Sequence, residues 1–234
     1  MLPCAASTLV SHLLDQPVGG WREAARTSVS VHYETSDPVV PVVCVATPAA
    51  VRLPHSLVVP ALPAPPAGPF RPVVTRWWTP DRPTGLTPPH PSRWAAWFDS
   101  RYDDLVPGHL VGRGPGLTPA GDDVLAGALV AARAVGHPGL ARWRRATRAA
   151  LATRRTTAVS VGMLHSALAG WAAPELAGAL TALCRDDDPA PAVERLLAVG
   201  HSSGRHLLDG VLHVLTTAPA HHRARHPANA EGAA

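Results

Sequence analysis

The pattern of apolar and polar positions divides the chain into a strand-like first part and a helix-like second part. Valine alternates with polar residues in TSVSVHYET (27–35), at the two-residue period of a half-buried strand. Short valine runs bounded by proline predict strands within 38–46 and 56–62, and proline inside such runs indicates edge strands or bulges. Proline is too dense at 60–91 for a helix, although FRPVVTRWWTP (70–80) is compatible with a strand. The proline-rich stretch is either a linker or a loop wrapped on the second half.

After residue 91 the apolar spacing becomes helical. In SRWAAWFDSRY (92–102), aromatic residues recur three and four positions apart behind a serine cap. A helix is predicted from about 119 to 135. It is apolar on every side through 124–132, which is typical of a buried central helix, and 156–173 repeats this pattern. An arginine-rich amphipathic helix is predicted between them, at 139–155.

Proline and glycine mark the remaining helix ends. Pro174 suits the first turn of PELAGALTALCR, and Pro189 or Pro191 opens AVERLLAVG. The segment HSSG (201–204) leads into a last helix, RHLLDGVLHVLTT. Its predicted buried stripe consists of Leu207, Leu208, Val211, Leu212 and Leu215.

Strands followed by helices predict an α+β fold. We expect a small proline-rich β-containing region at 1–91 and a helical domain of about six helices, two of them buried and apolar, at 92–217. The polar, alanine-rich end, 218–234, is expected to be a disordered tail.

Composition excludes several kinds of chemistry. All 21 basic residues are arginine, so a Schiff-base lysine, a Walker-type phosphate-loop lysine and a lysine base are excluded. The net charge of +4 is weak evidence for nucleic acid. The three cysteines, Cys4, Cys44 and Cys184, show no C-x-x-C pairing and support neither a disulfide scaffold nor a zinc knuckle.

We expect a cytoplasmic protein whose partners include neither membrane nor nucleic acid. No apolar run approaches the roughly 20 residues of a membrane span, and the first residues lack a basic leader. The arginines at 142–155 are predicted to form a solvated face or a subunit contact. The tail histidines His221, His222 and His226 are a weak metal-binding candidate.

The strongest local signal is a glycine-rich loop, GRGPGLTPAGDD (112–123). Thr118 and Pro119 match an N-cap and a first helical position, so the loop would bring backbone N–H groups to the positive end of a buried helix. Such an end can cradle an anion. We predict that Gly114, Gly116 and Thr118 supply amides to a phosphate or carboxylate, with Gly121 as a further binding residue.

Two acids, Asp122 and Asp123, follow in the first helical turn. They suggest either a magnesium site that bridges to phosphate or a carboxylate for proton transfer. Consecutive helical residues diverge by about 100°, so we expect one of the two to face the loop. The structural alternative is that they complement the helix dipole and that the glycines only make a turn. GLTP occurs twice in the chain, at 85–88 and 116–119, so the tetrapeptide by itself proves nothing.

A second loop, 200–204, also precedes a helix. His201 is a candidate acid or base, while Ser202, Ser203 and Gly204 suit oxyanion or substrate binding. The alternative, favoured unless the two loops converge, is a serine N-cap after a helix-ending glycine.

Four polar residues in the second apolar helix have two explanations. Thr156, Thr157, Ser160 and His165 could line the same cavity as the loops. For Ser160 and His165, a hydrogen bond within the helix or to a core group is the simpler explanation.

Three segments, GRGPGLTPAGDDVLAGAL, TTAVSVGMLHSALAG and GHSSGRHLLDGVLHVL, resemble in order and spacing the signature segments of the AllH-like family. The resemblance covers roughly 111–215. It implies a subunit of an oxamate carbamoyltransferase of allantoin and purine degradation, which exchanges oxalurate and phosphate with oxamate and carbamoyl phosphate and requires two other kinds of subunit.

The chain departs from the family pattern at three positions. Ala120 stands where the family usually has serine, His206 where an acid is expected, and Arg113 where an apolar residue is usual. Arg113 offers a charge-assisted grip on phosphate.

The sequence therefore predicts a carbamoyltransferase subunit that takes a small anion such as carbamoyl phosphate, phosphate or oxamate, with no certain cofactor beyond magnesium as a candidate. The alternatives are a non-catalytic anion-binding or scaffolding subunit and a purely structural helical module.

Overall fold

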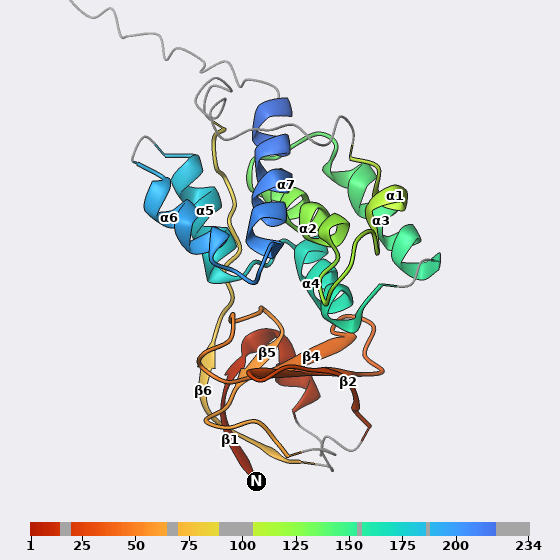
Figure 1. Cartoon of the computed structure of the whole chain (residues 1–234), viewed down its shortest axis with the longest axis vertical. Coiled ribbons are helices and arrows are strands. Elements are labelled where there is room, and N and C mark those ends of the chain that lie inside the picture. The colour runs from red at the N-terminus through yellow and green to blue at the C-terminus, as the bar shows by residue number, and fades with distance from the viewer. Residues whose placement is uncertain (15–19, 65–69, 89–104, 154–155, 186–187, 219–234) are drawn as a thin grey trace, which may run out of the picture.

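The computed structural model describes residues 1–14, 20–64, 70–88, 105–153, 156–185 and 188–218. A six-stranded sheet precedes a group of helices along the chain, and the two halves lie against each other (Figure 1). The predicted α+β class is confirmed. The helix predicted at 92–102, Arg154, Arg155 and the tail histidines lie outside the described residues.

The sheet has the strand order β2-β3-β4-β5-β1-β6. Its strands are β1 (Leu2–Ser7), β2 (Arg22–Arg26), β3 (Ser30–Glu34), β4 (Val42–Ala46), β5 (Ser56–Val58) and β6 (Pro72–Trp78). The β4–β5 and β1–β6 pairs are parallel and the other three pairs are antiparallel. The predicted strands correspond to β3, β4, β5 and β6, whereas β1 and β2 were not predicted.

The prediction that proline inside the valine runs indicates edge strands or bulges is wrong for β4 and β5, which lie inside the sheet and pair without a register shift. Pro41 comes just before β4 and Pro60 comes after β5, so both strands keep their backbone donors. The sequence of β2, REAAR, has no β-branched residue. Its extended conformation depends on pairing with β3, where Arg26 lies opposite Val31.

Seven α-helices and one 3-10 helix are present in the described part of the chain. They are η1 (Thr8–Leu13), α1 (Pro107–Leu110), α2 (Ala120–Ala134), α3 (Leu140–Thr153), α4 (Ala158–Ala169), α5 (Pro174–Leu183), α6 (Ala190–Leu197) and α7 (Ser203–Thr217). The longer helices match the predicted ones, and α2 is buried on nearly every side. All five residues of the stripe predicted on α7 are buried.

Helices α2 and α7 touch through their backbones. A Cβ atom added at Gly127 would lie 2.1 Å from the carbonyl oxygen of Leu207, and one added at Gly210 would lie 2.0 Å from that of Val124. These distances leave no room for a side chain, so only glycine permits the contact at both positions. The contact therefore fixes where the two helices cross.

The two halves are joined by a buried histidine. His55, just before β5, packs against α4 at Gly162, and its Nδ1 lies 3.0 Å from the hydroxyl of Ser166. Burial, followed by the nearby charges of His32 and His165, lowers the pKa of His55 to about 3. The ring therefore joins the halves as a neutral group at physiological pH.

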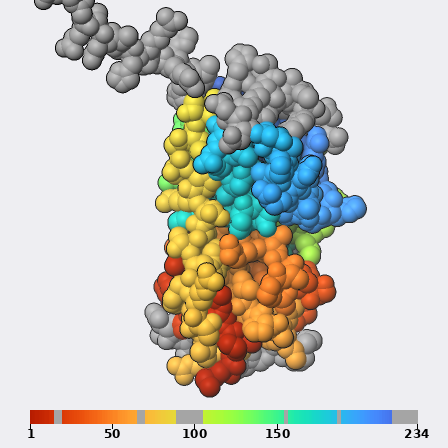
Figure 2. Space-filling view, turned by 90° about the vertical axis from the view of Figure 1, so that its left-hand side faces the viewer, coloured from red at the N-terminus to blue at the C-terminus, as the bar shows by residue number. Residues whose placement is uncertain are grey.

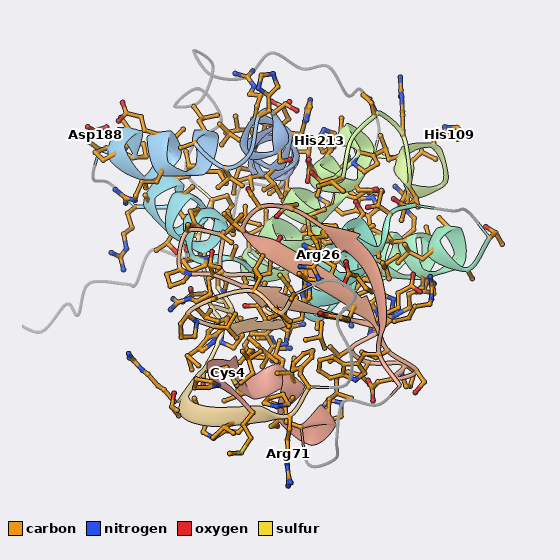
Figure 3. The ribbon with its side chains drawn as sticks, turned by 60° about the horizontal axis from the view of Figure 1, so that its bottom comes forward. Cys4, Arg26, Arg71, His109, Asp188 and His213 are labelled. Atoms are coloured by element: carbon orange, nitrogen blue, oxygen red, sulfur yellow. The ribbon has the colours of Figure 1, made fainter. Side chains whose placement is uncertain are left out.

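The chain after β6 continues onto the helical half, as Figure 2 shows. Asp81 pairs with Ala172 in an antiparallel bridge, and the Leu86 amide donates to the carbonyl of Ala134 at 2.9 Å. The later part of the proline-rich stretch, around Asp81 and Leu86, is thus wrapped on the second half. Figure 3 shows Cys4 and Arg71 at the sheet end and His109 and Asp188 at the helical end. None of the described helices is both long and apolar enough to cross a membrane.

We predict that Gly127→Ala and Gly210→Ala each lower the melting temperature strongly, by roughly 5 °C or more, or prevent folding, because a methyl group would separate the two backbones. The matched control is Gly178→Ala in α5, where an added Cβ meets nothing within 4 Å. This change should stabilise the protein slightly, since alanine is the better helix former. Equal melting temperatures for all three variants, measured by circular dichroism, would refute the backbone contact.

Candidate functional site

A cavity of about 650 Å³ lies between the sheet and the helices. Its walls come from both halves. On the helical side they are parts of α2, α4, α5, α6 and α7 with their connecting loops; on the sheet side they are Thr27, Val29, Ser30, His32, Cys44, Ala49, Ala50, Val51, Leu53 and Pro54. A volume of this size falls within the roughly 300–1,000 Å³ of small-molecule sites.

The two loops singled out in the sequence line this one cavity. Gly116 and Thr118 come from the glycine loop, and His201, Ser202 and Ser203 come from the serine loop. The hydroxyls of Thr118 and Ser203 are hydrogen bonded at 2.6 Å, which ties the loops together. The sequence favoured a purely structural serine loop unless the two loops converge. Because they line one cavity, that structural explanation is no longer favoured.

The start of α2 differs from the prediction. The carbonyl of Pro119 accepts the first helical hydrogen bonds, from Asp122 and Asp123, so Pro119 and not Thr118 is the N-cap. The side chain of Thr118 is instead engaged with Ser203. The side chain of Ser202, at the N-cap of α7, likewise makes no capping hydrogen bond.

Backbone N–H groups border the cavity without partners. Gly114 and Gly116 have φ values of 115° and 95°, which turn the loop in a way that L side chains rarely allow. Six lining residues have an N–H group that donates to no atom of the described chain: Gly116, Leu117, Thr118, His201, Ser202 and Ser203. Helices α2, α5 and α7 all begin at this cavity, and each start carries partial positive charge.

The two acids of α2 point to different places, as their angular spacing predicts. The carboxylate of Asp122 accepts the Gly112 amide at 2.8 Å and the hydroxyl of Thr156, and Asp122 does not line the cavity. Asp123 does line it. Asp122 therefore holds the loop in place, whereas Asp123 faces the cavity.

Asp123 is a fully buried acid without a hydrogen-bond partner on either carboxyl oxygen in the described chain. Burial raises its pKa to about 7, and the charge of Asp122 acts in the same direction. The nearby hydroxyls of Ser203 and Thr118 act to lower the pKa, but they are hydrogen bonded to each other and not to the carboxyl group. A carboxyl that titrates near neutrality can donate and accept a proton at physiological pH.

Four predicted binding residues lie outside the cavity lining. Arg113 and Gly114 are exposed and do not border the cavity. Gly121 and Gly204 donate their N–H groups to the carbonyls of Arg113 and Val199. An added Cβ would come within 2.1 Å of a backbone oxygen at Gly121 and within 1.9 Å at Gly204, so both glycines permit close backbone packing.

The start of α4 braces the glycine loop. The Thr156 hydroxyl donates to Asp122, and the Thr157 hydroxyl donates to the carbonyl of Leu117 while accepting the Ser160 amide at 3.1 Å. Neither threonine lines the cavity, in contrast to the suggestion from the sequence. The expectation that Ser160 hydrogen bonds locally is wrong, because its buried hydroxyl has no partner among the described residues.

The sheet side of the cavity carries a polar chain that the sequence did not predict. The hydroxyls of Thr27 and Ser30 are 3.0 Å apart, Ser30 Oγ lies 3.2 Å from His32 Nε2, and this nitrogen lies 3.8 Å from Cys44 Sγ. Burial lowers the pKa of His32 to about 4 and raises that of Cys44 to about 12, so both groups are neutral. Only tertiary contact places these strand residues opposite the helix starts.

The donor set does not fit a magnesium ion shared by the two acids. Both oxygens of Asp122 are already engaged, and the acids among the described lining residues are Asp123 in α2 and Glu175 in α5. No cluster of three or more histidine, cysteine or acidic residues occurs among the described positions. An ion here would depend on oxygen atoms that the substrate itself brings.

Comparison with known proteins adds a family match for the helical half. Residues 110–215 match the family model described as oxamate carbamoyltransferase subunit AllH. The match confirms the resemblance seen in the sequence, and it includes both cavity loops while leaving out the sheet side. No solved structure matches the chain.

The raised pKa of Asp123 predicts a pH-dependent stability. Between about pH 4 and about pH 7 the folded state keeps a proton that the unfolded state releases, so stability falls as pH rises through this window. Asp123→Asn removes this effect, and its melting temperature relative to the unmodified protein should rise by on the order of 5 °C between about pH 5 and about pH 8.

Asp122→Asn is the matched control for that measurement. It should be no more stable than the unmodified protein at either pH, because an amide nitrogen cannot accept the hydroxyl hydrogen bond from Thr156. Parallel pH profiles for Asp123→Asn and the unmodified protein would contradict the titration of Asp123.

Proposed function

We propose that this chain is a subunit of an oxamate carbamoyltransferase-like enzyme and that its cavity is where a carbamoyl group passes between phosphate and a small carboxylated amide. The observation that carries the proposal is the meeting of unpartnered amides from two helix starts with the buried carboxyl of Asp123. The family match over 110–215 supports the same activity. From that resemblance we also propose a place in purine degradation through allantoin, in the cytoplasm.

The helix starts provide the attraction for an anion. Each helix N-terminus acts as roughly half a positive charge and stabilises a nearby anion by about 0.3–2 kcal/mol. The starts of α2, α5 and α7 border the cavity, and the α5 start also carries the acid Glu175, so the attraction for an anion comes from α2 and α7. The N–H groups of Gly116, Leu117 and Thr118 on one side and of Ser202 and Ser203 on the other would hold phosphate oxygens or the oxyanion of the transition state.

Asp123 would move the proton that the reaction requires. An oxygen of phosphate attacks the carbamoyl carbon, and the bond from this carbon to the amide nitrogen breaks. The protonated carboxyl of Asp123 gives its proton to the leaving nitrogen and then takes the proton of the attacking phosphate. The products are carbamoyl phosphate and the free amide, and the carboxyl is restored. A pKa of about 7 suits both transfers.

His201 and the serines would close the site. His201 is exposed beside the cavity, where it can contact an anion or exchange a proton with solvent. No arginine occurs among the described lining residues. We therefore propose that another subunit supplies the permanent positive charge for phosphate, which explains a need for partners. A non-catalytic subunit would bind anions but show no turnover with those partners present.

We predict that sulfate binds more tightly at about pH 6 than at about pH 8, because an anion favours the neutral form of Asp123. Sulfate stays a dianion over this range, so a change in its affinity reflects titration of groups in the protein. Isothermal titration calorimetry measures the two dissociation constants. Asp123→Asn should keep the binding and lose most of the pH dependence.

His201→Gln tests separately the contribution of the imidazole that lines the cavity. It should leave the Asp123-dependent part of the pH effect in place. If sulfate instead bound better at about pH 8, Asp123 would not be the group that responds to the anion.

We predict that Asp123→Asn lowers the rate of oxalurate phosphorolysis by about 100-fold or more in the assembled enzyme, because general acid–base catalysis contributes on that scale. The assay follows carbamoyl phosphate formation by the chain with its co-encoded subunits. Sulfate binding and melting temperature serve as checks that the variant is folded. An Asp123→Asn enzyme with full activity would remove this carboxyl from the mechanism.

A further inference from the structure

We infer that the substrate of this chain is an N-carbamoyl amino acid with a sizeable apolar side chain, and not only a compound as small as oxalurate. The inference rests on the proposed function for the end of the ligand that carries the carboxylate and carbamoyl groups. It adds a second part to the ligand, an apolar body that extends away from the two loops.

The first observation is the size of the cavity. At about 650 Å³ it is in the middle of the range for drug-sized ligands, whereas phosphate together with oxalurate would occupy only part of it. A tight site for a two-carbon amide would need walls close to every polar atom of that amide. The remaining space in this cavity is available to a longer molecule.

The second observation is the character of the walls away from the loops. Apolar side chains line them from both halves of the molecule, among them Val29, Val51, Leu53, Val130, Met163 and Leu176. Such walls offer no hydrogen bonds to the amide and carboxylate atoms of oxalurate. They gain contact and release water when an apolar group covers them.

The third observation is that the polar groups on the sheet side are neutral. Thr27, Ser30, His32 and Cys44 supply hydroxyl, imidazole and thiol groups there, and neither arginine nor an acid is found among the lining residues 27–54. Asp123 and the helix starts belong to the helical half of the chain, which forms the other wall of the cavity. The charged end of the ligand therefore belongs at the helices, and the part facing the sheet is uncharged.

Binding of a graded series of ligands to the full chain tests this inference. Isothermal titration calorimetry is done with phosphate, oxalurate, N-carbamoylglycine, N-carbamoylalanine and N-carbamoylleucine. Each buried methylene should tighten binding by about fourfold, so N-carbamoylleucine should bind at least about 30-fold more tightly than N-carbamoylglycine. It should also bind more tightly than oxalurate.

A variant that fills part of the cavity tests where the apolar part of the ligand binds. Met163→Phe adds bulk to a lining residue of α4 and should weaken N-carbamoylleucine by about tenfold while leaving phosphate within about twofold. Leu140→Phe is the matched control, since Leu140 in α3 is similarly half-buried but does not line the cavity. If Met163→Phe fails to fold, Val51→Phe makes the same test from the sheet side.

The outcomes separate this inference from the proposed function. Phosphate binding with oxalurate equal to or tighter than N-carbamoylleucine would overturn the inference and leave the proposed function standing. A rise in affinity along the series that Met163→Phe or Val51→Phe abolishes would support it. Absence of binding by phosphate and by every carbamoyl compound would overturn both.

Discussion

The close backbone contact between α2 and α7 fixes the packing of the two helices whose preceding loops line the cavity. Gly127 and Gly210 let the two helices approach until an added methyl group would overlap a carbonyl oxygen. This contact fixes how the helices cross, and the loops before them line one cavity, where the hydroxyls of Thr118 and Ser203 are hydrogen bonded. Backbone amides from separate parts of the chain, without partners among the described residues, thereby border one cavity, where their partial positive charges add.

The two adjacent acids of α2 have different surroundings. Asp122 satisfies the amide of Gly112 and the hydroxyl of Thr156, so it fixes the loop against α4. Asp123 is turned into the cavity, where burial without hydrogen-bond partners raises its pKa to about 7. A loop held by the first acid keeps its amides at a constant position relative to the second, which is what transition-state stabilisation requires.

The sheet changes what the helical half can bind. The family match covers the helices alone, yet one wall of the cavity belongs to strands and loops from the first third of the chain. His55 and the wrapped segment around Asp81 and Leu86 hold this wall against the helices. The volume and the apolar character of the cavity therefore depend on a part of the chain that lies outside the match.

The sequence by itself determined the α+β class, the position of most described helices and the two loops, because helical periodicity, proline and glycine act over a few neighbouring residues. It did not determine that Thr118 bonds to Ser203, that Asp123 and not Asp122 reaches the cavity, or that His32 and Cys44 form the opposite wall. Strand β2 was missed for the same reason, since its residues become extended only by pairing with β3. These features depend on contacts between residues far apart in the chain, and the energies of such contacts exist only once the helices and the sheet have packed.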